Sequence, residues 1–316
     1  MGRRRKRKPY ERDVHGILLL DKPVGITSND ALQRIKRLYR AARAGHTGSL
    51  DKPATGMLPL CLGEATKFSS YLLNADKTYI SVAKLGVKTS TADAEGEILE
   101  TRQVPELNQR LLEKVIARFV GDIEQIPPMY SALKVDGQRL YKLAYQGLVI
   151  ERKSRPVTIH QIDLLHFDKD SFEMQVRCSK GTYIRTLVED IGQTLGCGAH
   201  VRSLRRLSTG PFNEAQMVSM ETIENLSKQG EEDEVALDQL LVPVDSALEH
   251  LAEVNLTEAT AYYLCLGQAV SITQAPTATE GLVRIYDHKH AFIGIGTILD
   301  DGRVAPKRLL KTGNTE

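Results

Sequence analysis

The sequence has no apolar run that approaches the ~20 residues needed to span a bilayer. After the basic N-terminus, only the four apolar residues 17–20 precede Asp21, and this run is shorter than the ~7–15-residue apolar core of a signal peptide. We therefore expect a cytoplasmic protein with no membrane partner. Hydrophobic residues at 41% and charged residues at 26% are ordinary for a soluble folded chain and argue against global disorder.

Patterns typical of metal and disulfide sites are also missing. The sequence has four cysteines without a C-x-x-C pair, and its eight histidines show no H-E-x-x-H spacing. Widely separated cysteines are most often small buried side chains. We therefore expect no metal ion and no disulfide framework, and we expect burial of Cys61, Cys178, Cys197 and Cys265.

Net charge is only +2, but the charges are unevenly distributed. Residues 1–12 carry seven basic side chains and one acid, and residues 34–43 carry five basic side chains and no acid. Residues 231–253 carry eight acids and no Lys or Arg. Any single run is best interpreted as a solvated surface. Several basic runs together favour one basic face for RNA or DNA, with the acidic stretch on the opposite side.

The irregular mixture of strands and helices, without a repeating βαβ period, predicts an α+β fold. Residues 1–12 are expected to be a disordered basic arm, and residues 45–63 a loop rich in Gly, Pro and Thr. Ser28 is expected to cap a helix whose outer face carries the second basic run. Helices are predicted at 28–42, 64–73 and 183–195, and strands at 17–20, 79–85, 172–178, 282–286 and 292–298.

Two segments contain residues suited to chemistry. Between 45 and 56, three glycines, a proline, a histidine and one carboxylate, Asp51, form a turned loop that can approach a ligand closely. On the residues alone, a turn or cap role for Asp51 is the favoured interpretation. Arg185 lies near the start of a predicted helix, where the helix dipole disfavours a cation. It either pairs with a carboxylate or phosphate or reaches solvent, and the residues alone leave both open.

Together, these two segments resemble the TruB family of pseudouridine synthases. The sequences GHTGSLD at 45–51 and CSKGTYIRTL at 178–187 carry the resemblance, and five further stretches match in order along the chain. They are 18–29, 63–67, 76–79, 125–134 and 204–207. One such stretch is a weak signal, whereas seven in order are specific.

The resemblance implies a catalytic domain at 13–250, built on a mixed, largely antiparallel sheet with flanking helices. It also implies a small β-rich, PUA-like RNA-binding domain at 251–316, in agreement with the strands predicted there. The implied reaction converts the T-loop uridine of tRNA, position 55, to pseudouridine without a cofactor or metal. The implied partner is the T arm of tRNA, and we expect a monomer with no obligate protein partner.

The resemblance further implies roles for particular residues. Asp51 corresponds to the nucleophile, and Arg185 pairs with it and keeps it charged. Tyr79 stacks on the flipped uracil, and its hydroxyl helps to remove the C5 proton. His46 contacts the RNA near the vacated stack. Further substrate contacts are expected from Tyr183, Leu204, Lys22, Arg34, Arg37 and Arg205.

Residues 125–155 are expected, from the same resemblance, to form a mobile insertion that closes over the RNA. Basic side chains of this insertion and of the 34–43 helix are expected to hold phosphates. In the insertion they are Arg139, Lys142, Arg152, Lys153 and Arg155. Because the target uridine is stacked in a folded loop, it must first be extruded.

The chain departs from the family pattern directly after the nucleophile. Relatives usually have proline there, whereas Lys52 follows Asp51 and proline comes next. The restriction that proline places on its preceding residue therefore moves to Lys52, and activity is expected to survive because the turn and Arg185 remain.

Two other functions fit part of the sequence. One is a non-catalytic RNA-binding or RNA-folding protein, and the other is a glycoside hydrolase that uses Asp51 and Glu64.

Overall fold

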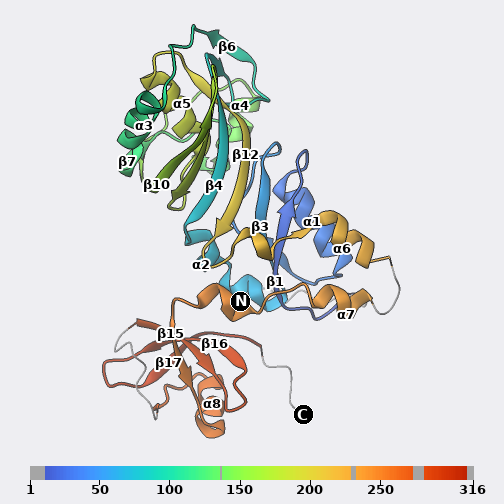
Figure 1. Cartoon of the computed structure of the whole chain (residues 1–316). Coiled ribbons are helices and arrows are strands. Elements are labelled where there is room, and N and C mark those ends of the chain that lie inside the picture. The colour runs from blue at the N-terminus through green and yellow to red at the C-terminus, as the bar shows by residue number, and fades with distance from the viewer. Residues whose placement is uncertain (1–10, 136, 229–232, 273–280, 312–316) are drawn as a thin grey trace.

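The computed structural model describes residues 11–135, 137–228, 233–272 and 281–311. Figure 1 shows a long sheet with helices beside it and a smaller β-rich unit below it. Of the predicted basic arm at 1–12, only Glu11 and Arg12 belong to the described residues. No helix within the described ranges is both long and apolar enough to cross a membrane.

Nine strands of the described chain form the large sheet, in the order β13-β1-β3-β12-β4-β11-β10-β7, with β2 paired to β3. The β1–β13 and β3–β12 pairs are parallel and the others are antiparallel. The predicted mixed, largely antiparallel sheet is therefore confirmed. The strands are β1 (Gly16–Lys22), β2 (Ala44–His46), β3 (Thr55–Leu62), β4 (Lys77–Leu85), β7 (Gly121–Gln125), β10 (Arg155–Phe167), β11 (Ser171–Cys178), β12 (Ala199–Thr209) and β13 (Val218–Ser219).

Helices flank this sheet, as predicted, with α3 and α5 beside its upper part and α1 and α6 beside its lower part in Figure 1. The α-helices are α1 (Ser28–Leu38), α2 (Ser69–Asn74), α3 (Gln109–Ile116), α4 (Leu140–Tyr145), α5 (Ile184–Thr194), α6 (Met220–Leu226), α7 (Asp233–Asp238) and α8 (Glu258–Cys265). Short 3-10 helices are η1 (Gly63–Phe68), η2 (Ala117–Phe119), η3 (Glu214–Gln216) and η4 (Val244–Leu248). Two small hairpins pair β5 (Val87–Thr89) with β6 (Ile98–Thr101), and β8 (Lys134–Val135) with β9 (Gln138–Arg139).

Strands β4 and β11 and helix α5 follow the predicted patterns. In β11, Phe172, Met174, Val176 and Cys178 are buried while the residues between them are more exposed, because successive side chains of a strand point to opposite faces. Helix α5 buries an apolar stripe formed by Ile184, Leu187, Val188 and Ile191, and it begins one residue after Tyr183. The core between these elements therefore follows from hydrophobic periodicity alone.

The prediction of a loop at 45–63 is confirmed for residues 47–54 but wrong elsewhere, because β3 and most of β2 lie within this range. Seven of the eight residues of β3 are buried, so the strand is apolar on both faces and lacks an alternating pattern. Proline is also rare inside central strands because it has no N–H to donate. Pro59 is tolerated here because β12 pairs only with Thr55 and Gly56, and β2 pairs only from Leu60 onward.

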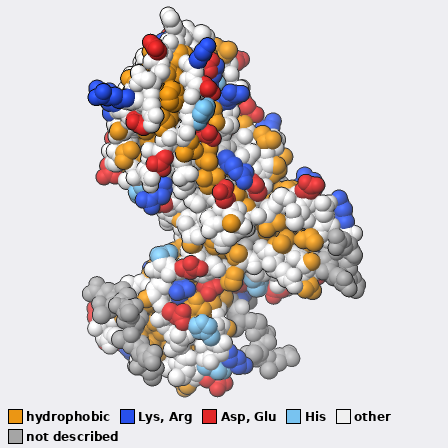
Figure 2. Space-filling view, in the orientation of Figure 1, with side chains coloured by type: hydrophobic (Ala, Val, Ile, Leu, Met, Phe, Trp, Pro, Cys, Tyr) orange, Lys and Arg blue, Asp and Glu red, His pale blue; other side chains and the backbone are white. Residues whose placement is uncertain are grey.

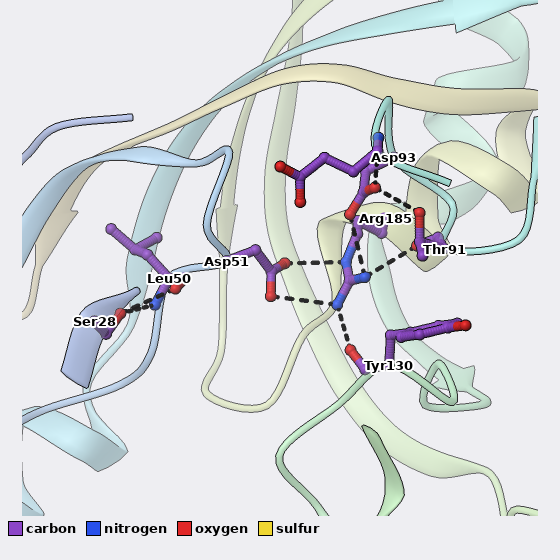
Figure 3. A network of polar contacts seen from close by, with 8 residues as sticks. Ser28, Leu50, Asp51, Thr91, Asp93, Tyr130 and Arg185 are labelled. Atoms are coloured by element: carbon purple, nitrogen blue, oxygen red, sulfur yellow. Dashed lines mark hydrogen bonds and ion pairs between the residues drawn. The ribbon is translucent and has the colours of Figure 1, made fainter. Parts of the chain in front are cut away.

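Helix α1 begins with a different cap and ends earlier than predicted. Thr27 is the N-cap: its hydroxyl accepts a hydrogen bond from Asp30 N at 3.1 Å, and the Asp30 carboxylate accepts one from Thr27 N at 3.3 Å. The helix ends at Leu38, and Arg40 has a positive φ of 47°, which ends the helical path. Ser28 instead points to the loop that carries Asp51 (Figure 3).

The prediction that basic and acidic runs lie on opposite sides is also wrong. Arg12 lies 2.9 Å from Glu234 and 2.6 Å from Asp238 of α7, and Arg40 also pairs with Glu234. In Figure 2, basic and acidic side chains are intermingled over the face drawn. The acidic helix therefore neutralises part of the N-terminal basic charge.

The smaller unit contains the predicted C-terminal strands. A sheet pairs β14 (Ala252–Asn255), β15 (Gly281–Tyr286), β16 (Phe292–Ile298) and β17 (Val304–Leu309) in that order, and Figure 1 places α8 beside it. Its core is separate from the main core, although Ile295 packs into a cluster with η1 and η4. Cys265 at the end of α8 is exposed, contrary to the expectation of burial, whereas the other three cysteines are buried.

Candidate active site

Asp51 lies in the loop that joins β2 to β3, and α1 holds this loop in place. The Ser28 hydroxyl accepts a hydrogen bond from Leu50 N at 2.8 Å and donates one to Leu50 O at 2.9 Å. On the other side, the Asp51 carbonyl accepts a hydrogen bond from Ala54 N at 3.1 Å. The Asp51 carboxylate therefore projects from a defined backbone toward Arg185 (Figure 3).

Arg185, in the first turn of α5, pairs with this carboxylate. Its Nε lies 3.0 Å from Oδ2 of Asp51, and its Nη2 lies 3.4 Å from Oδ1. The Arg185 side chain is 6% exposed and that of Asp51 is 44% exposed, so the carboxylate is accessible while the guanidinium is buried behind it. The predicted pairing of this cation with a carboxylate is confirmed, and the alternative of a solvent-exposed Arg185 is wrong.

Asp93 is a second carboxylate on the same guanidinium, and sequence reasoning missed it. Its Oδ2 lies 3.3 Å from Nη1 of Arg185, which also donates to Thr91 O at 3.0 Å. Nη2 donates to Tyr130 O at 2.7 Å. The guanidinium therefore joins two carboxylates and two carbonyls (Figure 3). Asp93 lies in a run of small and polar residues at 89–96, which indicates a turn but not its distant partner.

Opposing effects set the pKa of Asp51. Loss of solvation raises the pKa, the positive charge of Arg185 lowers it, the charge of Asp93 raises it and that of Lys22 lowers it, with a raised pKa as the net result. Arg185 therefore acts in the predicted direction but does not outweigh burial. A poorly solvated carboxylate is more reactive once it is ionised, as a nucleophile requires.

Two tyrosines approach Asp51 from β4 and from the start of α5. Burial raises the pKa of Tyr79 and of Tyr183, and the negative charge of Asp51 contributes in the same direction. Tyr79 is 8% exposed, and the positive charge of Arg206 opposes the rise in its pKa. Tyr183 N donates to Oε1 of Gln125 at 3.0 Å. The structure thus gathers both predicted tyrosines around the predicted nucleophile.

Leu204 and His46 lie on the strands beside this group. Leu204 is half-buried on β12, opposite Ser81 of β4. Burial lowers the pKa of His46, and the charges of Arg206 and Arg139 lower it further. The buried Nδ1 of His46 has no hydrogen-bond partner within the described residues. A neutral His46 next to the insertion is therefore available to a ligand but is poorly placed to carry a proton at neutral pH.

The structure does not support the predicted substrate contact of Lys22. Its side chain is fully buried, and Nζ donates to the carbonyls of Pro23, Ile26 and Lys52 at 2.8, 2.9 and 3.4 Å. Burial lowers the pKa of Lys22 to about 8. Lys22 thus holds the turn beside Asp51 from inside the protein, because a buried ammonium must find backbone acceptors.

Of the predicted substrate contacts Arg34, Arg37 and Arg205, two already have carboxylate partners. Arg205 donates to both oxygens of Asp21, at 3.0 and 2.9 Å, and Arg34 pairs with Glu224. Arg37 is exposed on α1. Arg34 and Arg205 remain partly exposed. Each can contact an RNA phosphate only if its guanidinium binds the phosphate and the carboxylate together or leaves the carboxylate for the phosphate. The structure therefore weakens these two assignments.

The insertion between β7 and β10 folds around the β8–β9 hairpin and α4. Its basic residues Lys134, Arg139 and Lys142 line a pocket of about 660 Å³ together with Tyr141. Arg152 instead donates to Pro127 O at 3.0 Å. Three cations beside an aromatic ring suit a phosphate backbone with an adjacent base. The predicted mobility of this segment stays a prediction.

The hypothesis of a glycoside hydrolase is wrong, because it requires Asp51 and Glu64 to lie close together and they do not. Strand β3 separates the two carboxylates, and its eight residues span about 25 Å at ~3.3 Å per residue. Paired glycosidase carboxylates lie about 5–10 Å apart. Glu64 instead accepts a hydrogen bond from Lys311 N at 2.8 Å and pairs with Lys67 at 2.5 Å, so it joins the two parts of the protein.

Models of one family match three consecutive segments of the chain. The TruB family pseudouridylate synthase N-terminal domain matches 36–184, the tRNA pseudouridylate synthase B C-terminal domain matches 185–249, and the pseudouridine synthase II TruB C-terminal domain matches 252–310. The tRNA pseudouridine synthase B of Stutzerimonas stutzeri is 56% identical over 305 residues, covering 96% of this chain and 98% of its own length. This chain belongs to the TruB family.

Other comparisons agree with this TruB membership. The tRNA pseudouridine synthase B of Nitrosococcus oceani is 53% identical over 307 residues, covering 97% of this chain and 98% of its own length. A chain from a crystal structure of a Cbf5-Nop10-Gar1 complex is 26% identical, with a TM-score of 0.73, and the match covers 93% of this chain and 84% of that chain. The TruB fold therefore extends through both parts of the protein.

Lys52 departs from the TruB pattern, but the turn directly after Asp51 is still held by hydrogen bonds. Lys52 is exposed, and its carbonyl accepts hydrogen bonds from Gly25 N at 3.0 Å and from Lys22 Nζ at 3.4 Å. These contacts hold the backbone directly after Asp51, where a proline would otherwise limit it. The ion pair between Asp51 and Arg185 forms with this substitution in place.

Proposed function

We propose that this chain is a tRNA pseudouridine synthase that converts the T-loop uridine, position 55 of tRNA, to pseudouridine. The observation that carries the proposal is the Asp51–Arg185 ion pair close to Tyr79. The proposal also draws on TruB family membership and on relatives named tRNA pseudouridine synthase B. The choice of position 55 rests on the resemblance of the sequence motifs.

The reaction is an isomerisation that balances without a redox partner. The N1–C1′ bond breaks and a C5–C1′ bond forms, while C5 loses its proton and N1 gains one. The Asp51 carboxylate attacks either C1′ of the sugar or C6 of the base, and in both cases it holds one fragment covalently while the ring turns. Attack requires the ionised carboxylate, which Arg185 stabilises against burial.

Extrusion of the uridine comes before this attack and costs a few kcal/mol. The ring of Tyr79 offers a stacking surface for the extruded base, and Leu204 and Tyr183 add apolar area beside it. The Tyr79 hydroxyl is assigned the removal of the C5 proton, which restores the aromatic ring. His46, whose pKa is lowered mainly by burial, is assigned to the RNA next to the vacated position and not to proton transfer.

Recognition of the T arm is assigned to cations at the rim of the site and in the insertion. Arg37 on α1 and Lys134, Arg139 and Lys142 around the insertion pocket suit the phosphates of a folded loop. Lys22 is left out because it is buried. We further propose that the protein acts as a monomer in the cytoplasm.

Mapping of pseudouridine in an unmodified transcript tests the proposal. The full-length tRNA and an isolated T-arm stem-loop are each incubated with the protein, and pseudouridine is located by carbodiimide modification and primer extension. The expected result is one modified position, the T-loop uridine, in both RNAs. Modification at another position in the tRNA would reject the T-loop assignment, and no modification of either RNA by a folded protein would reject the synthase activity.

A further inference from the structure

Arg206 is a buried cation next to the site for which the proposed reaction has no role. It lies on β12, is 1% exposed and is the largest of the fully buried side chains. A guanidinium cannot lose its charge inside a protein, so each of its N–H groups needs a partner there. Among the described residues its hydrogen-bond partners are the backbone carbonyls of Met57 and Gly48, and it forms no ion pair with a carboxylate there.

The guanidinium of Arg206 spans the two ends of the loop that carries Asp51. Its Nε donates to Met57 O at 2.6 Å and its Nη2 donates to Gly48 O at 3.1 Å. Gly48 comes three residues before Asp51 and Met57 comes six residues after it. One side chain therefore fixes the distance between the start and the end of the loop.

The backbone of Arg206 also contacts the end of the loop that carries Asp51, through the pairing of β12 with β3. Gly56 pairs with Arg206 in the parallel β3–β12 ladder and has a positive φ of 95°. A Cβ at Gly56 would lie 2.2 Å from Arg206 O and 2.8 Å from Arg206 N, distances at which atoms overlap. Only glycine therefore allows β3 and β12 to approach this closely, and the approach sets the depth at which the guanidinium lies.

The same guanidinium also reaches Tyr79. Arg206 and Tyr79 are register partners on β12 and β4, so their side chains lie on the same face of the sheet. The positive charge of Arg206 lowers the pKa of the Tyr79 phenol against the larger effect of burial. Lys22 and Lys77 lie close enough for Arg206 to lower the pKa of each as well. The Tyr79 side chain therefore shares one face of the sheet with a buried cation.

We propose that Arg206 is a positioning residue that holds the Asp51 loop and the Tyr79 phenol in one arrangement and stabilises negative charge on the phenol oxygen. This inference rests on the proposed synthase activity. Burial raises the pKa of Tyr79, so the phenol is protonated at the start and first gives its own proton to N1, the atom that gains one in the overall reaction. When the proton then leaves C5, the electrons of the C–H bond return to the ring and the proton passes to the phenolate oxygen of Tyr79. A fixed cation at 1% exposure keeps that oxygen oriented and lowers the free energy of its anionic form.

Two substitutions separate this role from a structural one. Arg206→Met keeps volume but removes all donors and the charge, whereas Arg206→Lys keeps the charge and one donor group. Arg284→Met is a matched control, because Arg284 is another mostly buried arginine that donates to a backbone carbonyl, Leu251 O at 3.1 Å, in the C-terminal unit. For each protein we would measure thermal unfolding, affinity for the T-arm stem-loop and the single-turnover rate with saturating enzyme.

Arg206→Met is expected to lose about 100-fold in rate, as for a displaced catalytic group, with unchanged RNA affinity because Arg206 does not reach the surface. Arg206→Lys is expected to recover part of that loss, and Arg284→Met to match the parent rate. With deuterium at C5 of the target uridine, the kinetic isotope effect is expected to rise above the parent value in Arg206→Met, because loss of the cation slows proton removal.

Three results would overturn the inference. The first is a folded Arg206→Met variant that reacts at the parent rate. The second is an Arg206→Met variant that loses RNA affinity but keeps the parent rate. The third is an Arg206→Met variant that reacts slowly but has the same isotope effect as the parent. If Arg206→Met does not fold, the Arg206→Lys variant tests the proposal instead. A rate and an isotope effect equal to those of the parent would overturn the proposal. A slower rate with a larger isotope effect would support it. An inactive parent protein would instead contradict the proposed function itself, so the two failures are distinguishable.

Discussion

At the scale of single residues, the loss of solvation and the charge of Arg185 together set the protonation of Asp51. The guanidinium is shared between Asp51 and Asp93, so only part of its charge offsets the loss of solvation at the nucleophile. Asp93 itself raises the pKa of Asp51 while it orients the arginine. Two carboxylates on one arginine thus give a nucleophile that is held firmly but is easier to protonate than an ordinary aspartate.

The pH dependence of the reaction follows from this balance. Loss of solvation raises the pKa of Asp51 more than Arg185 lowers it, and only the ionised carboxylate attacks. The single-turnover rate is therefore expected to fall in acid with a midpoint above the ~3.9 of a free aspartate. Asp93→Asn removes a negative neighbour and is expected to move that midpoint downward. An unchanged or higher midpoint in Asp93→Asn would contradict this account of the charge balance.

At the scale of elements, the motifs on the two sides of the site were predictable from the residues, but their pairing was not predictable from the residues alone. The sequence places Asp51 in a glycine-rich turn and Arg185 at a helix start, and the resemblance joins them. Strand β3 was missed because it is apolar on both faces and contains proline, which hides a strand from periodicity. Asp93 and Arg206 were missed because their partners lie far away in sequence.

Ser28 and Thr27 give a test of how α1 supports the nucleophile. Ser28→Ala leaves the buried N–H and C=O of Leu50 without their partner, which is expected to lower the free energy of unfolding by about 1–3 kcal/mol and to slow catalysis. Thr27→Ala removes the helix cap and is expected to lower it by about 1 kcal/mol with little change in rate. Urea unfolding and single-turnover assays measure both, and equal rate losses would contradict the assignment.

At the scale of the whole molecule, Glu64 links the two parts. Its carboxylate binds Lys67 on η1 and the backbone of Lys311 after β17, and Lys67 Nζ donates to Leu309 O at 2.7 Å. Phe68 and Phe292 pack across the same junction with ring centroids 5.7 Å apart. These contacts hold the C-terminal unit against the end of the large sheet away from Asp51, so the unit is oriented before any RNA arrives.

Removal of the Glu64 carboxylate is expected to loosen this junction without affecting chemistry. Burial alone would raise the pKa of Glu64, but hydrogen bonds from Lys67 and Lys311 N lower it overall. A lowered pKa contributes stability above the ordinary glutamate range that is lost as pH falls through the folded-state value. Glu64→Ala is therefore expected to unfold about 2 kcal/mol more easily at pH 7, with a smaller difference in acid and a parent-like rate. A difference that grows in acid would contradict this.

The most direct test of the central claim is the Asp51→Asn variant on a T-arm stem-loop. Asparagine keeps the size and hydrogen-bonding shape of the side chain but cannot act as the nucleophile. Tritium release from C5 of the target uridine reports turnover, and filter binding reports affinity. We expect no detectable release by the variant, parent-like affinity for the RNA and parent-like thermal unfolding. Release at a rate close to the parent rate would contradict the assignment of Asp51 as the nucleophile.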